Sequence, residues 1–186
     1  MTPHANSTVR DIIEWVVVFA IALAAWMLVR TFVIEPYMVP TGSMENTIEI
    51  GDQVFAQKVT TELGQMPQPG EIIVFSNPDA SSDHDILVKR VIATAGQTVD
   101  LSEGRVYVDG QQLDESYTQG SSYPLASQVE GVQLSYPYTV PDGCVWVMGD
   151  NRENSADSRY FGPVEQSEVI GVVVFRYWPL NRIGTL

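Results

Sequence analysis

Residues 15–29 read WVVVFAIALAAWMLV and contain no charged side chain. With the apolar residues on either side, the hydrophobic stretch covers positions 12–34. As a helix rising about 1.5 Å per residue, it would span roughly 34 Å, enough to cross a bilayer core with some tilt. Pro36 disfavours helical geometry at Glu35, so the helix should end near there. The sequence therefore predicts one transmembrane helix over residues 12–34.

Two other interpretations of this stretch are possible. A cleavable signal peptide has a basic first region and a small-x-small site just beyond a short apolar core. Here Arg10 is offset by Asp11, and the Ala22-Leu23-Ala24 triplet lies inside the apolar run. A buried helix of a soluble protein is disfavoured by the length. A retained anchor is the favoured interpretation, although one arginine near each end leaves its orientation poorly signalled.

Composition excludes several classes of protein. The 186 residues include 10 Lys and Arg against 23 Asp and Glu, giving a net charge of −13, and no basic cluster that nucleic-acid binding would require. Cys144 is the single cysteine, which excludes an internal disulfide framework. With His4 and His84 as the only histidines, a histidine-based metal centre is not expected. No glycine-rich phosphate loop occurs.

Beyond residue 36 the helical pattern gives way to short apolar runs. Positions 1–34 carry no net charge, so residues 35–186, with 8 basic and 21 acidic side chains, hold the whole −13. The runs are rich in Val, Ile, Tyr and Phe, which favours strands, and Asp109-Gly110 is a two-residue hairpin signal. The sequence thus predicts a mostly β body. The predicted strands are 53–59, 71–75, 86–93, 105–108, 133–140, 145–148 and 169–177.

Ser43 is a candidate nucleophile. It lies in Pro40-Thr41-Gly42-Ser43-Met44, shortly after the apolar stretch, and Gly42 permits a tight backbone beside it. A serine nucleophile needs a base and donors for the developing oxyanion, and the Thr41 hydroxyl can supply one donor. On its own this segment also fits an ordinary turn.

Lys89 is the candidate base. It stands in the predicted strand ILVKRVI, where Leu87 and Val91 share its face. Burial among apolar groups lowers the pKa of a lysine, and a neutral Lys89 can accept a proton from Ser43. On an edge strand the same side chain would instead extend to solvent.

A polar segment, GDNRENSADSR at 149–159, follows the predicted strand 145–148. If it is extended, Ser155, Asp157 and Arg159 face the same way, so that Asp157 and Arg159 can pair and Ser155 can orient an amine. The alternative is a solvated loop with surface ion pairs that contribute little.

His84 is the alternative base. It is flanked by Asp83 and Asp85 in a polar stretch that resembles an exposed loop. Neither GxSxG nor SxxK is present, which argues against an α/β-hydrolase and a β-lactamase. Cys144 is interpreted as a packed small apolar residue rather than a nucleophile.

Taken together, these segments resemble bacterial type I signal peptidases, membrane-bound Ser/Lys endopeptidases. The resemblance covers nearly the whole chain and includes Glu35-Pro36 and a closing Phe161-Gly162-Pro163-Val164. It implies an antiparallel β-sheet catalytic domain at 35–186 with a small inserted β-subdomain at 98–144. It also implies a cytoplasmic N-terminus at 1–11 and a single-pass location in the cell membrane.

The resemblance also implies roles for individual residues. Ser43 would be the nucleophile and Lys89 the general base, and the Ser43 amide and Thr41 hydroxyl would form the oxyanion hole. Ser155 would orient the lysine amine. Asp157 and Arg159 would form a supporting ion pair beside Gly149 and Asp150. Shallow substrate pockets that admit small residues would be lined by Tyr37, Val39, Met44, Ile48, Leu87 and Val88.

The implied activity is removal of signal peptides from exported preproteins after an Ala-x-Ala type site. No metal or cofactor is implied, and no nucleic acid; the implied partners are preproteins, the lipid bilayer and a nearby secretion translocon. The family often has Pro-Thr soon after Ser-Met, whereas this chain has Glu45-Asn46-Thr47, which predicts a change in loop rigidity. Three alternatives stay open: a peptidase with a dedicated substrate, a catalytically silent membrane-anchored adaptor, and a His84-based hydrolase.

Overall fold

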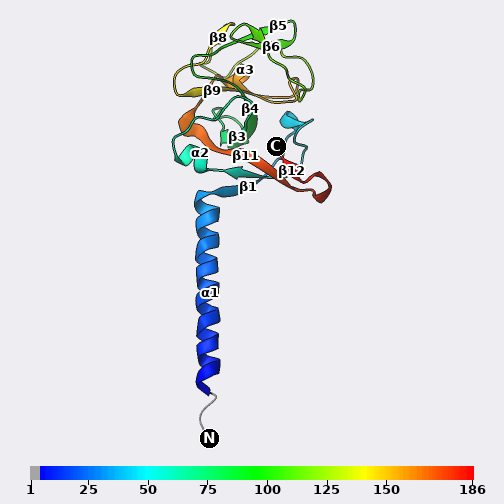
Figure 1. Ribbon diagram of the computed structural model, residues 1–186. Helices are drawn as coiled ribbons and strands as arrows, with labels where there is room; N and C mark the ends of the chain where they lie inside the picture. The colour runs from blue at the N-terminus through cyan, green and yellow to red at the C-terminus, as the bar shows by residue number, and fades with distance from the viewer. Residues whose placement is uncertain (1–4) are drawn as a thin grey trace.

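Helix α1 (Ala5–Phe32) projects as a stalk from a body made mostly of β-strands (Figure 1). The computed structural model describes residues 5–186, so part of the predicted cytoplasmic segment, 1–4, lies outside the described residues. The predicted helix end needs a correction. The helix stops at Phe32, and Ile34 already begins strand β1, because Pro36 and the residue before it favour extended backbone.

The described side chains of α1 are exposed along its length, including Trp15 at 74% and Phe19 at 71%. Within the described residues, no helix satisfies the length and apolarity that crossing a membrane requires. The membrane span at 12–34 is thus not confirmed and stays a prediction.

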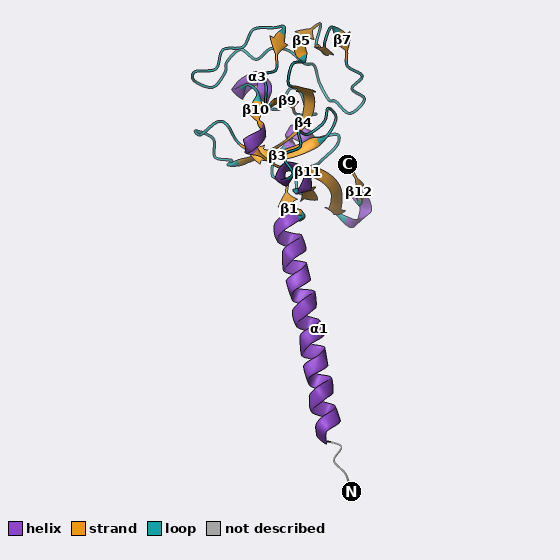
Figure 2. Cartoon of the chain, turned by 60° about the vertical axis from the view of Figure 1, so that its left-hand side comes forward, coloured by secondary structure: helices purple, strands orange, loops and turns teal. Residues whose placement is uncertain are grey.

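The body is built on a large antiparallel sheet, seen from a second side in Figure 2. Its edge strand β1 pairs only with β2, which accommodates Pro36 because a proline lacks the N–H that an inner strand must donate. Strand β12 (Gly184–Thr185) pairs with β11. The main path runs β1 (Ile34–Met38), β2 (Gln53–Gln57), β11 (Val169–Trp178), β3 (Ile72–Ser76), β4 (Ile86–Thr94), β9 (Cys144–Met148) and β10 (Val164–Glu165).

A smaller sheet lies at the end of the body away from α1. Its strands fall inside the predicted 98–144 insert: β7 (Gln111–Gln112), β6 (Arg105–Val108), β5 (Thr98–Ser102) and β8 (Tyr138–Thr139). The predicted strand 133–140 is too long, because Pro137 cannot donate to a ladder and only Tyr138–Thr139 pair. The predicted hairpin forms at Asp109-Gly110 between β6 and β7.

The two sheets share a core. Trp146 and Met148 of β9 pack with Val99 and Val106 of the smaller sheet, and buried Cys144 lies in the same cluster. Apolar contact therefore fixes the small sheet onto the strands that carry the polar segment 149–159.

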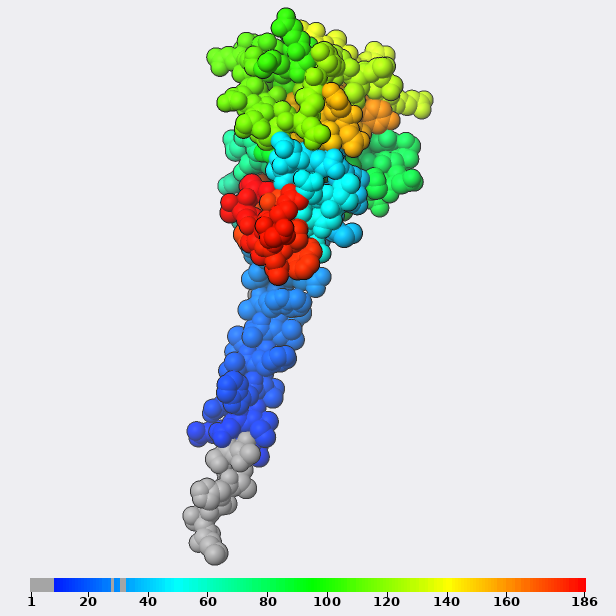
Figure 3. All heavy atoms as spheres, turned by 90° about the vertical axis from the view of Figure 1, so that its right-hand side faces the viewer, coloured from blue at the N-terminus to red at the C-terminus, as the bar shows by residue number. Residues whose placement is uncertain are grey.

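Short helices complete the fold. They are α2 (Val59–Glu62), α3 (Ser158–Phe161) and the single 3₁₀ turns Gly42–Met44, Gln166–Glu168 and Leu180–Arg182. The C-terminal residues fold back beside the segment near position 50, close to the end of the stalk (Figure 3). There Arg176 donates to the carbonyl of Thr47 and lies 3.3 Å from Asp52, which fixes the loop that follows Ser43.

Candidate active site

Ser43 lies in one turn of 3₁₀ helix, Gly42–Met44, between the end of β1 and the start of β2. The backbone amide of Asn151 donates to the Ser43 carbonyl at 3.0 Å. The side-chain amide of Asn151 donates to the Gly42 carbonyl at 3.1 Å and to Glu45 at 3.0 Å. Asn151 thereby fixes the turn from the neighbouring segment 149–159. Ser43 is 8% exposed.

Lys89 reaches this turn from β4. Its Nζ lies 2.7 Å from Ser43 Oγ and 3.1 Å from the carbonyl oxygen of Val88. The residue is 2% exposed. Burial lowers the pKa of Lys89 from 10.5 to about 8, while the negative charges of Asp157 and Asp150 act in the opposite direction.

The sheet topology explains why Lys89 stands at an open position. Strand β4 pairs with β3 from Ile86 to Arg90, but β9 joins its other side only from Arg90 onward. Among the described strands, none pairs with the second side of Ile86–Lys89, and the Ser43 turn lies beside this free edge. Lys89, the last residue of β4 before the pairing with β9 begins, therefore lies beside Ser43.

Gly149 follows β9 directly beside Ser43. A Cβ atom on this residue would lie 2.5 Å from the Ser43 carbonyl oxygen and would also collide with Ser155 Oγ. Its amide donates to Asp157 at 3.1 Å. Only glycine permits this close approach of two backbone segments.

Asp157 and Arg159 form a buried bidentate ion pair. Arg159 Nε and Nη2 each donate to Asp157 at 2.8 Å, and both residues are at most 1% exposed. The predicted pair forms with Asp157 in extended backbone, and α3 begins at the next residue, because Asp157 caps α3 by accepting from the Arg159 amide at 3.1 Å. The charge pair thus lies at the start of α3.

The expected contact of Ser155 is absent. Within residues 5–186, its buried Oγ has no hydrogen-bond partner. Lys89 Nζ is turned instead toward Ser43 and the carbonyl of Val88. Ser155 packs against Gly149, whose missing side chain makes room for it.

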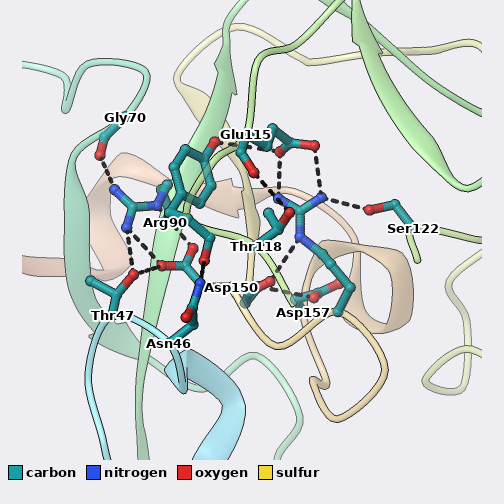
Figure 4. A network of polar contacts seen from close by, with 12 residues as sticks. Asn46, Thr47, Gly70, Arg90, Glu115, Thr118, Ser122, Asp150 and Asp157 are labelled. Carbon is teal, nitrogen blue, oxygen red and sulfur yellow. Dashed lines mark hydrogen bonds and ion pairs between the residues drawn. The ribbon is translucent and has the colours of Figure 1, made fainter. Parts of the chain in front are cut away.

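A second network, which was not predicted from the sequence, supports this wall (Figure 4). Arg90 donates to Asp150 at 2.9 and 2.7 Å, and Thr47 donates to the same carboxylate at 2.5 Å. The Arg90 guanidinium lies 4.0 Å from the ring centroid of Tyr117. Arg152 beside it pairs with Glu115. The sequence signal for both pairs was the density of charged side chains in 149–159.

Two hollows open at Ser43. The first cavity, of about 320 Å³, lies between segments 37–41 and 83–88. Four of the predicted pocket residues line it: Tyr37, Val39, Leu87 and Val88. Met44 and Ile48 do not; both are completely buried in the core with Val54 and Val74.

The second cavity, of about 210 Å³, lies on another side of Ser43 and is lined by Lys89 as well. His84 is exposed on the loop before β4 and lines both cavities. Thr41 also lines both. Within residues 5–186, no cluster of His, Cys, Asp and Glu side chains is suited to hold a metal ion. The chemistry available here is that of a hydroxyl beside a buried amine.

Known proteins resemble the chain over most of its length. The family model described as signal peptidase, peptidase S26, matches residues 12–178. A probable signal peptidase I-1 of Synechocystis sp. is 42% identical over 172 residues, covering 89% of this chain and 82% of the relative. Signal peptidase IB of Staphylococcus aureus (strain COL) is 32% identical over 182 residues, covering 93% of each. A solved signal peptidase I structure from Enterococcus faecalis V583 matches with 32% identity and a TM-score of 0.43, covering 58% of this chain and 97% of that one.

Proposed function

Because the chain belongs to the signal peptidase family, peptidase S26, and is a type I signal peptidase, a serine protease, we propose that Ser43 and Lys89 are its catalytic dyad. The observation that carries this proposal is the 2.7 Å contact between Lys89 Nζ and Ser43 Oγ in a buried setting. In its neutral form the amine has a lone pair with which to accept the hydroxyl proton.

The proposed reaction is acyl transfer. As Lys89 removes the proton, Ser43 Oγ attacks the carbonyl carbon of the scissile peptide bond. The carbon–nitrogen bond then breaks, and Lys89 delivers its proton to the leaving amine. Water next attacks the acyl-enzyme while Lys89 takes one of its protons. The bond between the acyl carbon and Ser43 Oγ then breaks, Lys89 returns the proton to Ser43 Oγ, and the new carboxyl end is released.

The proposed oxyanion hole consists of the Ser43 amide and the Thr41 hydroxyl. The first amides of a helical turn have no acceptor within it, so Ser43 N–H is available for the developing charge. Thr41 precedes the turn in extended conformation and lines both cavities. In this proposal the buried pair Asp157–Arg159, with Gly149 and Asp150, positions the wall behind Lys89.

The proposed substrates are preproteins with small residues, usually Ala, at the first and third positions before the cut. The free edge of Ile86–Lys89 supports binding of an extended chain as an added strand. Tyr37, Val39 and Leu87 then border the side of the substrate that becomes the acyl group. The limited volume of this first cavity supports selection of small side chains.

The proposed location is the cell membrane, near the translocon that delivers preproteins. The exposed apolar side chains of α1 support contact with lipid at 12–34. Segment 1–11 would then be cytoplasmic, and residues 35–186, with the insert at 98–144, would lie outside. Trp178 ends β11 and Leu180 follows it, both are exposed, and β11 and β12 lie at the end of the body from which α1 projects (Figure 1), where a bilayer surface would be.

The test is cleavage of a preprotein with Ala at both small positions, in detergent micelles. Wild type should cut after the second Ala, and Ser43→Ala and Lys89→Ala should both abolish cutting. His84→Ala is the matched control and should retain it. Cutting that survives Lys89→Ala would move the base elsewhere. A folded wild type that cuts no general preprotein would indicate a dedicated substrate or a silent adaptor.

A further inference from the structure

The two cavities share a boundary at the nucleophile. Thr41, Ser43, His84 and Leu87 line both of them. A polypeptide whose scissile carbonyl lies at Ser43 therefore has one hollow on each side of the cut. The part that becomes the acyl group occupies one, and the part that leaves as an amine occupies the other.

Lys89 distinguishes the two sides. It lines the second cavity together with Ser43 but is not among the lining residues of the first. In the proposed mechanism the proton taken from Ser43 must pass from Lys89 Nζ to the nitrogen of the leaving amine. That nitrogen must lie within hydrogen-bond reach of Nζ. The leaving side therefore lies toward the second cavity.

Resting on the proposed function, we infer that the second cavity is the subsite for the first residue after the cut, and that Asp79 makes this subsite select against acidic side chains. The polar side chains that line this cavity are Asn77, Asp79, Ser82 and Asn154, beside Tyr160. The carboxylate of Asp79 gives this wall a negative charge, which disfavours an acidic side chain.

Asp79 supplies the charge at this wall. One oxygen, Oδ1, accepts from the Ser81 amide at 2.9 Å and from the Ser81 hydroxyl at 2.6 Å. These bonds lower the pKa of the Asp79 carboxyl below its ordinary value, so it is ionised at neutral pH. Tyr160 also hydrogen-bonds this carboxylate, and Asp79 is the one carboxylate among the described residues that line this cavity. Two other carboxylates of the same loop, Asp83 and Asp85, line only the first cavity.

Because Asp79 lines the second cavity and Asp83 of the same loop lines only the first, Asp83 provides a matched control. Asp79→Asn removes the charge from the second cavity and retains the Oδ1 acceptor for Ser81. Asp83→Asn makes the same change of charge in the same loop but borders the first cavity only. The two variants thus differ in which side of the cut loses a charge.

The experiment measures kcat/KM for preproteins that differ only in the first residue after the cut: Lys, Gln or Glu. Wild type should favour Lys over Gln, and Gln over Glu, by about threefold for each unit of charge at a partly solvated site. Asp79→Asn should remove this preference, and Asp83→Asn should keep it.

Equal rates for the three substrates in wild type would overturn the inference. So would a preference that disappears equally in both variants. The Gln substrate separates this from the proposed function: if wild type leaves it intact, or Ser43→Ala still cuts it, the dyad proposal itself has failed.

Discussion

Lys89 and Arg159 are buried to nearly the same extent, at 2% and 1% exposure, in neighbouring parts of one wall. Arg159 donates two hydrogen bonds of 2.8 Å to the carboxylate of Asp157. Lys89 contacts only the Ser43 hydroxyl and a backbone carbonyl. The arginine keeps its charge, whereas the pKa of the lysine is lowered to about 8 by burial.

In the proposed mechanism this difference separates a supporting cation, Arg159, from a reactive amine, Lys89. An arginine cannot lose its proton in a protein, so it can be buried only with a partner. Arg90 with Asp150 and Arg152 with Glu115 follow the same pattern. Among the buried cations of residues 5–186, Lys89 alone has no carboxylate in contact. The ion pairs stabilise the segments around Ser43. In the proposed mechanism the amine of Lys89, which contacts no carboxylate, is left available for proton transfer.

The largest expected effect on cleavage comes from replacing Lys89 by arginine, a cation that stays charged. Lys89→Arg keeps the positive charge but removes the ability to become neutral, so cleavage should fall by about 10³-fold or more. The rate of preprotein cleavage measures this. Lys58→Arg, which retains the ion pair with Glu35, is the matched control and should cut at close to the wild-type rate. Near-normal cleavage by Lys89→Arg would show that Lys89 is not the base.

Breaking an arginine pair should be the next largest effect. Asp157→Asn keeps an oxygen to cap α3 but leaves Arg159 buried and uncompensated, which should lower the free energy of unfolding by about 3 kcal/mol. Denaturant unfolding measures the loss. Glu35→Gln removes the partner of the partly exposed Lys58 and should cost less than about 1 kcal/mol. Equal losses in the two variants would mean that burial does not set the energy of these pairs.

The sequence predicted the contact between Ser43 and Lys89 better than the ion pairs around it. Ser43 and Lys89 stand in local patterns that signal their chemistry, a glycine-flanked serine and a lysine inside an apolar strand. The partner of Arg90 lies sixty residues away in sequence. It depends on the register that sets Arg90 opposite Met148 in β9, two positions before Asp150. No local pattern encodes that register.

Tertiary packing also determines positions that the periodicity of apolar residues in the sequence does not predict. Met44 and Ile48 are apolar residues near the nucleophile, so they fit a pocket wall as well as a core, and only the position of β2 and β3 buries them. Ile34 continues an apolar run that predicts helix, although it starts β1. Asp157 is part of a polar run that reads as extended, but capping α3 satisfies a free helix amide and turns the chain.

Removing the unpaired amine should stabilise the protein. In Lys89→Met the buried polar group is replaced by an apolar chain of similar length, and the free energy of unfolding at pH 7 should rise by about 2 kcal/mol. The pKa of Lys89 is lower in the folded protein than its ordinary value of 10.5, so its contribution to stability is lost as pH falls from 10.5 through about 8. The advantage of Lys89→Met should therefore be full at pH 7 and shrink toward pH 10.5. A variant that is less stable than wild type at pH 7 would contradict this.

The smallest expected effect is a pH profile that reports the lysine rather than the arginines. Only neutral Lys89 can take the Ser43 proton, so kcat/KM should rise with pH and level off above a midpoint near 8, the lowered pKa of Lys89. Between pH 7 and pH 8 the rise should be about fivefold, because the neutral fraction grows from about a tenth to about a half. Asp157 raises the pKa of Lys89, so the folded fraction of Asp157→Asn should show its midpoint at lower pH than wild type. His84→Ala should leave the midpoint unchanged. A midpoint that moves with His84, or that is the same in Asp157→Asn, would mean that the titrating base is not the buried amine.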